Sequence, residues 1–273
     1  MACSQNRGVD ADEAFYRPTA DPAVFEPTRR TEGLWNAKVQ HAGPPSALLV
    51  REIERLESSI PGPSQVTRFT VEILGPVPTD EVRVRAVVER PGRTVELVTA
   101  ELLAGGRPAL RARAWRIRSA EVDLPQDVLE ELPGPPVPDE VASFREASWT
   151  ESYLGAVEFR FVDGHFQDPG PATVWTRLRI PLVAGEDATP LQRLVAVADS
   201  GNGLSSLLDF DEWWFINTDL SLHLHRQPEG EWICVDARST LDPSGIGLAE
   251  TQLFDRRGRV GRGAQSLMVG PRL

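Results

Sequence analysis

One carboxylate in the 273-residue sequence stands out because an apolar helical pattern surrounds it. Thr189-Pro190 is typical of a helix start, with a capping threonine and a proline at the first helical position. Apolar residues then recur at helical spacing, at Leu191, Leu194, Val195 and Ala198. We predict a helix over 190–208 that contains Asp199. Burying a carboxylate without a partner is costly, so Asp199 is either a partly exposed or capping residue, or a catalytic one.

The segment after this helix is predicted to be a strand, because residues 216–225 alternate strictly between apolar and polar. Asn217 lies on its polar face and Thr218 on its apolar face. His223 and His225 also lie on the polar face, two residues apart. A metal site requires a third ligand in a suitable place, and no convincing one occurs, so we predict no metal site and a solvated strand face instead.

The remaining pattern is that of an α+β protein in which helices cover antiparallel strands. A first helix is predicted from Pro44-Pro45, after which strand patterns and turn signals alternate. The predicted strands span 66–74, 81–92, 93–106, 108–118, 158–166, 172–182, 231–240, 246–255 and 259–269.

We divide the chain into a flexible tail (1–15), a first unit (16–118), a proline-rich linker (119–147) and a second unit (148–273). The two units repeat one pattern at a constant offset of 151 residues, since the apolar positions of 68–74, 94–107 and 108–117 recur in 219–225, 245–258 and 259–268. An unbroken register favours duplication. Two such units can pair their sheets and so remove an edge from each.

Composition narrows the partners and the compartment. A net charge of −11 argues against a nucleic-acid partner. No apolar run is long enough for a membrane span, and the N-terminal residues lack the features of a secretory signal. There are two cysteines, Cys3 and Cys234, and Cys234 has the context of a core residue. We therefore expect a cytoplasmic protein without disulfides, and no cofactor is indicated.

Several segments together resemble the double hotdog acyl-CoA thioesterases of the thioesterase II type, in particular the thioesterase-like proteins of actinobacteria. The resemblance covers nearly the whole chain from about Phe15. It is carried by QHAGPPSALLVREIE (40–54), VADSGNG (197–203), NTDLSLHLHRQPEGEWICVDARS (217–239) and GLAETQLFDRRGRVGRGAQSLMV (247–269). It implies an α+β double hotdog, in which each of two tandem units wraps an antiparallel sheet around a central helix.

The resemblance also implies a catalytic set. In this family an Asp on the second hotdog helix, a Thr at the start of the next strand and a Gln on the last strand hold the hydrolytic water. The matching positions are Asp199 and Gln265, while the threonine position falls on Asn217, with Thr218 beside it. Asn217 departs from the family pattern, although an amide can still bind water or orient Asp199.

The substrate side of the site is expected near the first helix. His41 lies beside the expected pocket, and the Gly43 N–H at the helix start is a candidate donor to a thioester carbonyl oxygen. Ala42 replaces the usual first glycine, and two prolines without N–H groups follow Gly43. Trp213 and Trp214 are candidates for an acyl pocket, with core packing as the alternative.

Three functions follow from these residues. The first is hydrolysis of an acyl-CoA thioester by a water that Asp199 activates, with Gln265 and Asn217. The second is a catalytically weak protein that binds acyl-CoA or lipid, which the Asn217 and Ala42 departures favour. The third, an enoyl-CoA hydratase, would need a histidine five residues after Asp199, where Leu204 stands. A homodimer is also expected.

Overall fold

The computed structural model describes residues 14–128, 134–146 and 151–272. Its strands form one large sheet in which every strand pair is antiparallel, in the order β1-β2-β4-β5-β6-β3-β10-β13-β12-β11-β8-β7, with β9 also paired to β13. The strands are β1 (Tyr16–Pro18), β2 (Val24–Pro27), β3 (Ser64–Ile73), β4 (Val82–Arg90), β5 (Val95–Ala104), β6 (Arg107–Arg118), β7 (Val157–His165), β8 (Asp168–Leu178), β9 (Trp213–Asn217), β10 (Asp219–Leu224), β11 (Ile233–Asp242), β12 (Ile246–Asp255) and β13 (Gly258–Pro271).

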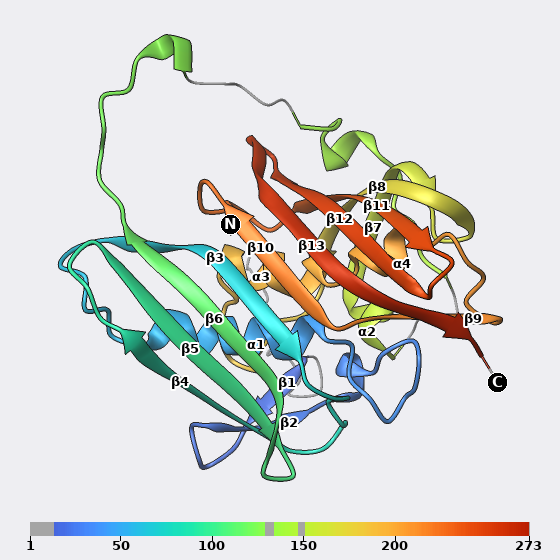
Figure 1. Ribbon diagram of the computed structural model, residues 1–273, viewed down its shortest axis with the longest axis horizontal. Helices are drawn as coiled ribbons and strands as arrows, with labels where there is room; N and C mark the ends of the chain where they lie inside the picture. Colours follow the sequence, from blue (N-terminus) through green and yellow to red (C-terminus); the bar gives the residue numbers. More distant parts are fainter. Residues whose placement is uncertain (1–13, 129–133, 147–150, 273) are drawn as a thin grey trace, which may run out of the picture.

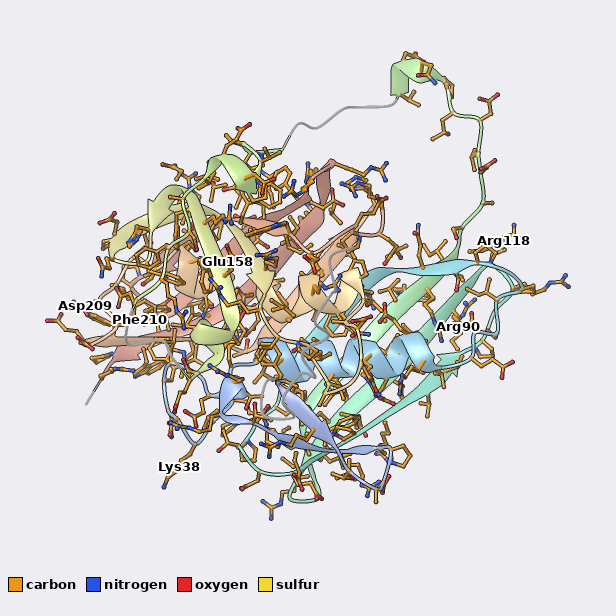
Figure 2. The ribbon with its side chains drawn as sticks, turned by 180° about the vertical axis from the view of Figure 1, so that it is seen from behind. Lys38, Arg90, Arg118, Glu158, Asp209 and Phe210 are labelled. Carbon is orange, nitrogen blue, oxygen red and sulfur yellow. The ribbon has the colours of Figure 1, made fainter. Side chains whose placement is uncertain are left out.

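The two longest helices, α1 (Gly43–Arg55) and α3 (Pro190–Ala198), lie on one face of this sheet, which we call the inner face. Figure 1 looks onto the opposite, outer face with α1 and α3 behind it, and Figure 2 shows these helices from the other side. The α-helices are α1 (Gly43–Arg55), α2 (Tyr153–Ala156), α3 (Pro190–Ala198) and α4 (Gly201–Leu204), and the 3-10 helices are η1 (Arg29–Thr31), η2 (Gln126–Val128) and η3 (Pro138–Glu140). One continuous hydrophobic core joins both helices to both halves of the sheet. The α+β prediction is confirmed.

The strand bounds follow the predicted repeat. β5 and β12 begin and end 151 residues apart, and β4 and β11 begin 151 residues apart. The two halves meet where β3 pairs with β10, and Thr70 lies opposite Ser221, its own equivalent at that offset. A local two-fold axis therefore passes between these two residues, and neither half keeps a free edge there.

The predicted helix over 190–208 is too long. α3 ends at Ala198, Asp199 is its C-cap, and α4 begins only at Gly201. Glycine is a poor helix former, and Gly201 and Gly203 both follow the break. The backbone N–H of Asn202 donates to Gln265 Oε1 from β13 at 3.1 Å. Asp199 therefore lies at the end of a helix and not inside one.

The strand predicted over 216–225 divides at Thr218. β10 pairs with both β3 and β13, whereas β9 pairs with β13 alone, because β3 ends at Ile73. Asn217 and Thr218, at this division, both line a cavity.

Residues 1–13, 129–133, 147–150 and 273 lie outside the described part of the chain. They include most of the predicted tail, part of the predicted linker and the start of the predicted second unit. Ala14 and Phe15 are fully buried, so the core includes the last two residues of the predicted tail. In the predicted linker, Pro136 accepts a hydrogen bond from Trp175 Nε1 at 2.6 Å. The division into two units and a linker stays a prediction.

Candidate active site

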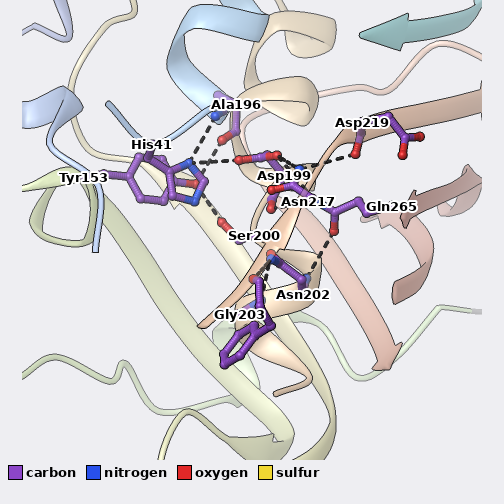
Figure 3. A network of polar contacts seen from close by, with 12 residues as sticks. His41, Tyr153, Ala196, Asp199, Ser200, Asn202, Gly203, Asn217, Asp219 and Gln265 are labelled. Carbon is purple, nitrogen blue, oxygen red and sulfur yellow. Dashed lines mark hydrogen bonds and ion pairs between the residues drawn. The ribbon is translucent and has the colours of Figure 1, made fainter. Parts of the chain in front are cut away.

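Three of the predicted site residues meet at the end of α3 (Figure 3). The Asp199 side chain is nearly inaccessible, with 4% of the residue exposed. Its Oδ1 accepts hydrogen bonds from Asn217 Nδ2 at 2.8 Å and from Gln265 Nε2 at 3.3 Å. The alternative of a partly exposed helix residue is therefore wrong for Asp199.

Gln265 is held in one orientation by its other contacts. Its Nε2 also donates to the backbone oxygen of Asp199 at 3.0 Å, while its Oε1 accepts the Asn202 N–H. A Cβ on Gly201 would lie 2.9 Å from Gln265 Oε1 and 2.7 Å from the Thr251 methyl carbon, so only glycine allows this approach. Gln265 is buried on the inner face and does not face solvent.

Thr218 lies beside this group without joining it. Its hydroxyl is exposed and bonds Ser266 O at 3.4 Å and Asp219 Oδ1 at 3.5 Å. Asn217 thus takes the place next to Asp199 that the family pattern gives to threonine. Its amide nitrogen also donates to Asp219 O at 3.3 Å.

His41 contributes to the site from the first half of the chain. Its Nδ1 is 3.3 Å from Asp199 Oδ2, and its ring stacks on Tyr153 with centroids 3.8 Å apart. Burial lowers the pKa of His41 from its ordinary value, and the negative charge of Asp199 opposes this shift only in part. The ring is therefore neutral near pH 7. The sequence places His41 beside the pocket, but its contact with Asp199 is a new finding.

Gly43 does not offer the free N–H group that we expected. Its N–H donates to His41 Nδ1 at 3.1 Å, and the Ser46 N–H is taken by Ala42 O. The glycine serves the packing of α1 on α3, since a Cβ at this position would lie 2.1 Å from Ala196 O.

Two further polar residues complete the group and were missed in the sequence. The Tyr153 hydroxyl bonds both Ala196 O and Ser200 Oγ at 2.9 Å, and burial raises its pKa. Asn202 donates from its side chain to Phe215 O at 3.1 Å. Tyr153 follows the proline-rich segment, and no local pattern connects it to a residue more than forty positions away.

A cavity of about 440 Å³ adjoins Asp199, Asn217 and His41. Its wall is largely apolar and comes from loop 33–42, the β3–β4 turn and β9. The apolar lining residues are Leu34, Trp35, Val39, Ala42, Ile73, Pro76, Val77, Leu154, Phe166, Phe210, Ile216 and Met268. Trp213 and Trp214 are half-buried and do not line it, and Phe215 is core, packed edge-to-face on Trp35.

Other candidate residues lie elsewhere. Cys234 is fully buried, and burial raises its pKa, as expected of a core thiol. His223 and His225 are exposed on the outer face. Within the described ranges, no three His, Cys, Asp or Glu side chains are grouped closely enough to hold a metal ion. None of the helices described is long and apolar enough to cross a membrane.

A buried carboxylate at a helix end, beside an apolar cavity in a duplicated sheet, fits a thioester hydrolase of the hotdog class. The profile of the acyl-CoA thioesterase N-terminal domain matches residues 31–117, and that of the C-terminal domain matches residues 129–269. The chain belongs to the acyl-CoA thioesterase family.

Solved structures share the fold of this chain. A hot dog fold protein from Alicyclobacillus acidocaldarius is 16% identical over 96% of this chain and 98% of that one, with a TM-score of 0.71. A candidate thioesterase II from Thermobifida fusca YX is 17% identical over 93% of this chain and 95% of that one, also with a TM-score of 0.71. Acyl-CoA thioesterase II TesB2 from Mycobacterium marinum is 14% identical over 96% of both chains, at 0.63. No curated protein matches the chain by sequence. These likenesses confirm the double hotdog fold.

Proposed function

We propose that this protein hydrolyses acyl-CoA thioesters with Asp199 as general base. The observation that carries the proposal is the Asp199 carboxylate, which is buried at the wall of an apolar cavity and hydrogen-bonded by Asn217 and Gln265. These two amides fix the carboxylate in one orientation, as a base must be to receive a proton from a bound water.

In this proposal a water binds between Asp199 and the Asn217 carbonyl oxygen. Both Asn217 amide hydrogens are directed at Asp199 and Asp219, so the Oδ1 atom remains to accept a hydrogen from water. The water oxygen attacks the thioester carbonyl carbon while Asp199 takes its proton. The tetrahedral intermediate then expels the thiolate, which recovers that proton, giving the free acid and CoA.

In these reaction steps His41 acts as a positioning residue for Asp199. Gly43 N–H points at His41 Nδ1, so in the neutral ring this nitrogen is an acceptor. Once Asp199 has taken a proton, its carboxylic acid can share the single Nδ1 lone pair with the Gly43 N–H, because Nδ1 is 3.3 Å from Oδ2. Tyr153 stacks on the ring and holds it in place.

The test is the release of free thiol from a panel of acyl-CoAs by the wild type, Asp199→Asn and Asp211→Asn. We expect Asp199→Asn to lower kcat at least about a hundredfold, the low end for a general base. Asp211 is exposed on the same segment, so Asp211→Asn is a control for the same chemical change. Equal rates in all three proteins would exclude Asp199 as the base.

The same assay decides the alternatives. No hydrolysis by the wild type, with acyl-CoA binding still measurable, would favour the catalytically weak binding protein. The hydratase has less support, because Leu204, at the required histidine position, is 1% exposed in the core.

We also propose the expected homodimer. Ile246, Met268 and Ile216 are direct neighbours across β12, β13 and β9 on the outer face, and each is at least 38% exposed. Such a contiguous apolar patch is typical of an interface. Sedimentation velocity would show a dimer for the wild type and a shift toward monomer for Ile246→Glu, because Ile246 is 63% exposed and, unlike Met268 and Ile216, does not line the cavity. A cytoplasmic location stays part of the proposal.

A further inference from the structure

Four side chains form a row across the outer face of the sheet, close to the line where the two halves meet. Trp115 on β6 lies opposite Arg68 on β3, Arg68 lies opposite His223 on β10, and His223 lies opposite Arg262 on β13. We call these four residues the cationic row. Adjacent strands are about 4.8 Å apart, so the two arginines lie on either side of His223 and about 10 Å from each other.

No carboxylate bonds the arginines of the cationic row within the described ranges, and Asp236 and Glu250 line a neighbouring groove that Arg262 shares. Within the described part of the chain, neither Arg68 nor Arg262 forms an ion pair, and Arg68 Nε is buried without a hydrogen-bond partner. The groove over the row has a volume of about 480 Å³ and also contains Arg259 and His225, and no carboxylate lines it. Two arginine charges separated by about 10 Å repel each other where no carboxylate lies between them. An anion bound between the two guanidinium groups would offset this repulsion.

The repeat gives an internal comparison for this charge. Arg111, the first-half equivalent of Arg262 at the 151-residue offset, lies opposite Glu101 and bonds it at 3.0 Å. Arg262 lies opposite Gln252, the equivalent of Glu101, and an amide leaves the arginine charge uncompensated. At the same offset, Asp219 is the equivalent of Arg68 and Glu72 is the equivalent of His223. These two residues lie opposite each other, so the row related to the cationic row by the local two-fold axis has two acidic residues at its centre.

We propose that the cationic row binds the phosphorylated nucleotide end of CoA while the acyl thioester occupies the cavity beside Asp199. Arginines bind phosphate through several N–H groups, and the half-buried Trp115 at one end of the row offers an aromatic surface for a purine base. The Arg90 guanidinium lies 5.9 Å from the centroid of the Trp115 ring and adds positive charge at this end of the row. This inference rests on the proposed hydrolysis of acyl-CoA.

The position of the row relative to the cavity fits an extended ligand. Thr218 is exposed and lines the cavity. It directly precedes β10, and His223 lies five residues further along the chain on that strand. At about 3.3 Å per residue the two are separated by about 16–17 Å, a span suited to the pantetheine arm of CoA. The hydroxyls of Thr70 and Ser221 lie between them, at the local two-fold axis.

The first experiment compares Arg68→Gln, Arg262→Gln and Arg111→Gln on one acyl group carried by CoA or by pantetheine. Loss of a charge-assisted phosphate contact should raise KM for acyl-CoA about tenfold in the first two variants, with kcat unchanged. Their kcat/KM for acyl-pantetheine should equal that of the wild type. Arg111→Gln removes an ion-paired outer-face arginine. It should change neither the KM for acyl-CoA nor the kcat/KM for acyl-pantetheine. An unchanged KM for acyl-CoA in Arg68→Gln and Arg262→Gln would overturn the proposal.

The second experiment separates this inference from the hydrolytic function. Titration calorimetry with adenosine 3′,5′-bisphosphate should show binding to the wild type that weakens about tenfold in Arg68→Gln. Binding without any thioester hydrolysis would keep the nucleotide site and reject the proposed activity. Hydrolysis without nucleotide binding would keep the proposed activity and reject the nucleotide site. The protein could also hydrolyse an acylated carrier protein faster than acyl-CoA and lose this preference in both arginine variants. That result would overturn the proposed nucleotide site and assign the cationic row to a protein carrier.

Discussion

Asp199 owes its orientation to partners from distant parts of the chain. Asn217 and Gln265 bond one carboxylate oxygen, and His41 faces the other. The carboxylate is therefore compensated without a cation, in contrast to buried Glu96, which pairs with Arg116 at 2.8 Å. In the proposed mechanism Asp199 therefore takes the proton of water without first having to break an ion pair.

His41 should make stability depend on pH in a defined direction. Burial lowers its pKa below the ordinary 6.5, so between these two values the unfolded chain binds a proton that the folded chain does not. The free energy of unfolding should consequently fall as pH decreases through this range. Urea unfolding from about pH 7.5 to about pH 5.5 should show a shallower decrease for His41→Gln than for the wild type. Parallel curves would mean that His41 titrates normally.

The sequence located the carboxylate and both amides of this site because they lie in long motifs shared with a family. It did not reveal the contacts of His41, Tyr153 and Asn202. Each of these depends on packing between segments far apart in sequence, such as the stacking of Tyr153 on a ring 112 positions earlier. Local periodicity carries no information about such pairs.

At the level of elements, the approach of α1 to α3 is set by one glycine. Gly43 lies against Ala196 O, and a methyl group at 2.1 Å from that oxygen cannot be accommodated without moving a helix. Gly43→Ala should lower the free energy of unfolding by about 1–3 kcal/mol, and more if the helix start shifts. Gly75→Ala is the control, because a Cβ there meets nothing within 4 Å. Equal urea midpoints for the two variants would contradict this reading.

Strands were predicted more accurately than helix ends. β12 spans 246–255 as predicted, since alternation along a strand with one buried face is a local signal. The break after Ala198 and the division at Thr218 depend instead on Gln265 from β13 and on the end of β3. Both breaks fall at the proposed site, where tertiary contacts override the local pattern.

On the scale of the whole molecule, pairing of β3 with β10 makes the two halves one cooperative unit. Leu222 is fully buried opposite Phe69 at this line, and Leu222→Ala should cost about 2–5 kcal/mol. Hydrogen exchange should accelerate together in β5 and β12, which lie in different halves. Ser221→Ala, which changes the outer face of the same strand, should leave exchange nearly unaltered. Acceleration confined to β12 would show that the halves unfold separately.

The repeat also determines how many centres a chain can carry. Ala114 on β6 is the equivalent of Gln265 on β13, because Ala114 lies opposite Val98 just as Gln265 lies opposite Ala249. Ala114 is fully buried and has no amide with which to orient a carboxylate. The first half thus has a packed apolar side chain where the second has an amide, and it contributes His41 to the proposed site. Turnover per mole should be counted per chain and not per half, and a symmetric ancestor with two centres would have had to lose one of them.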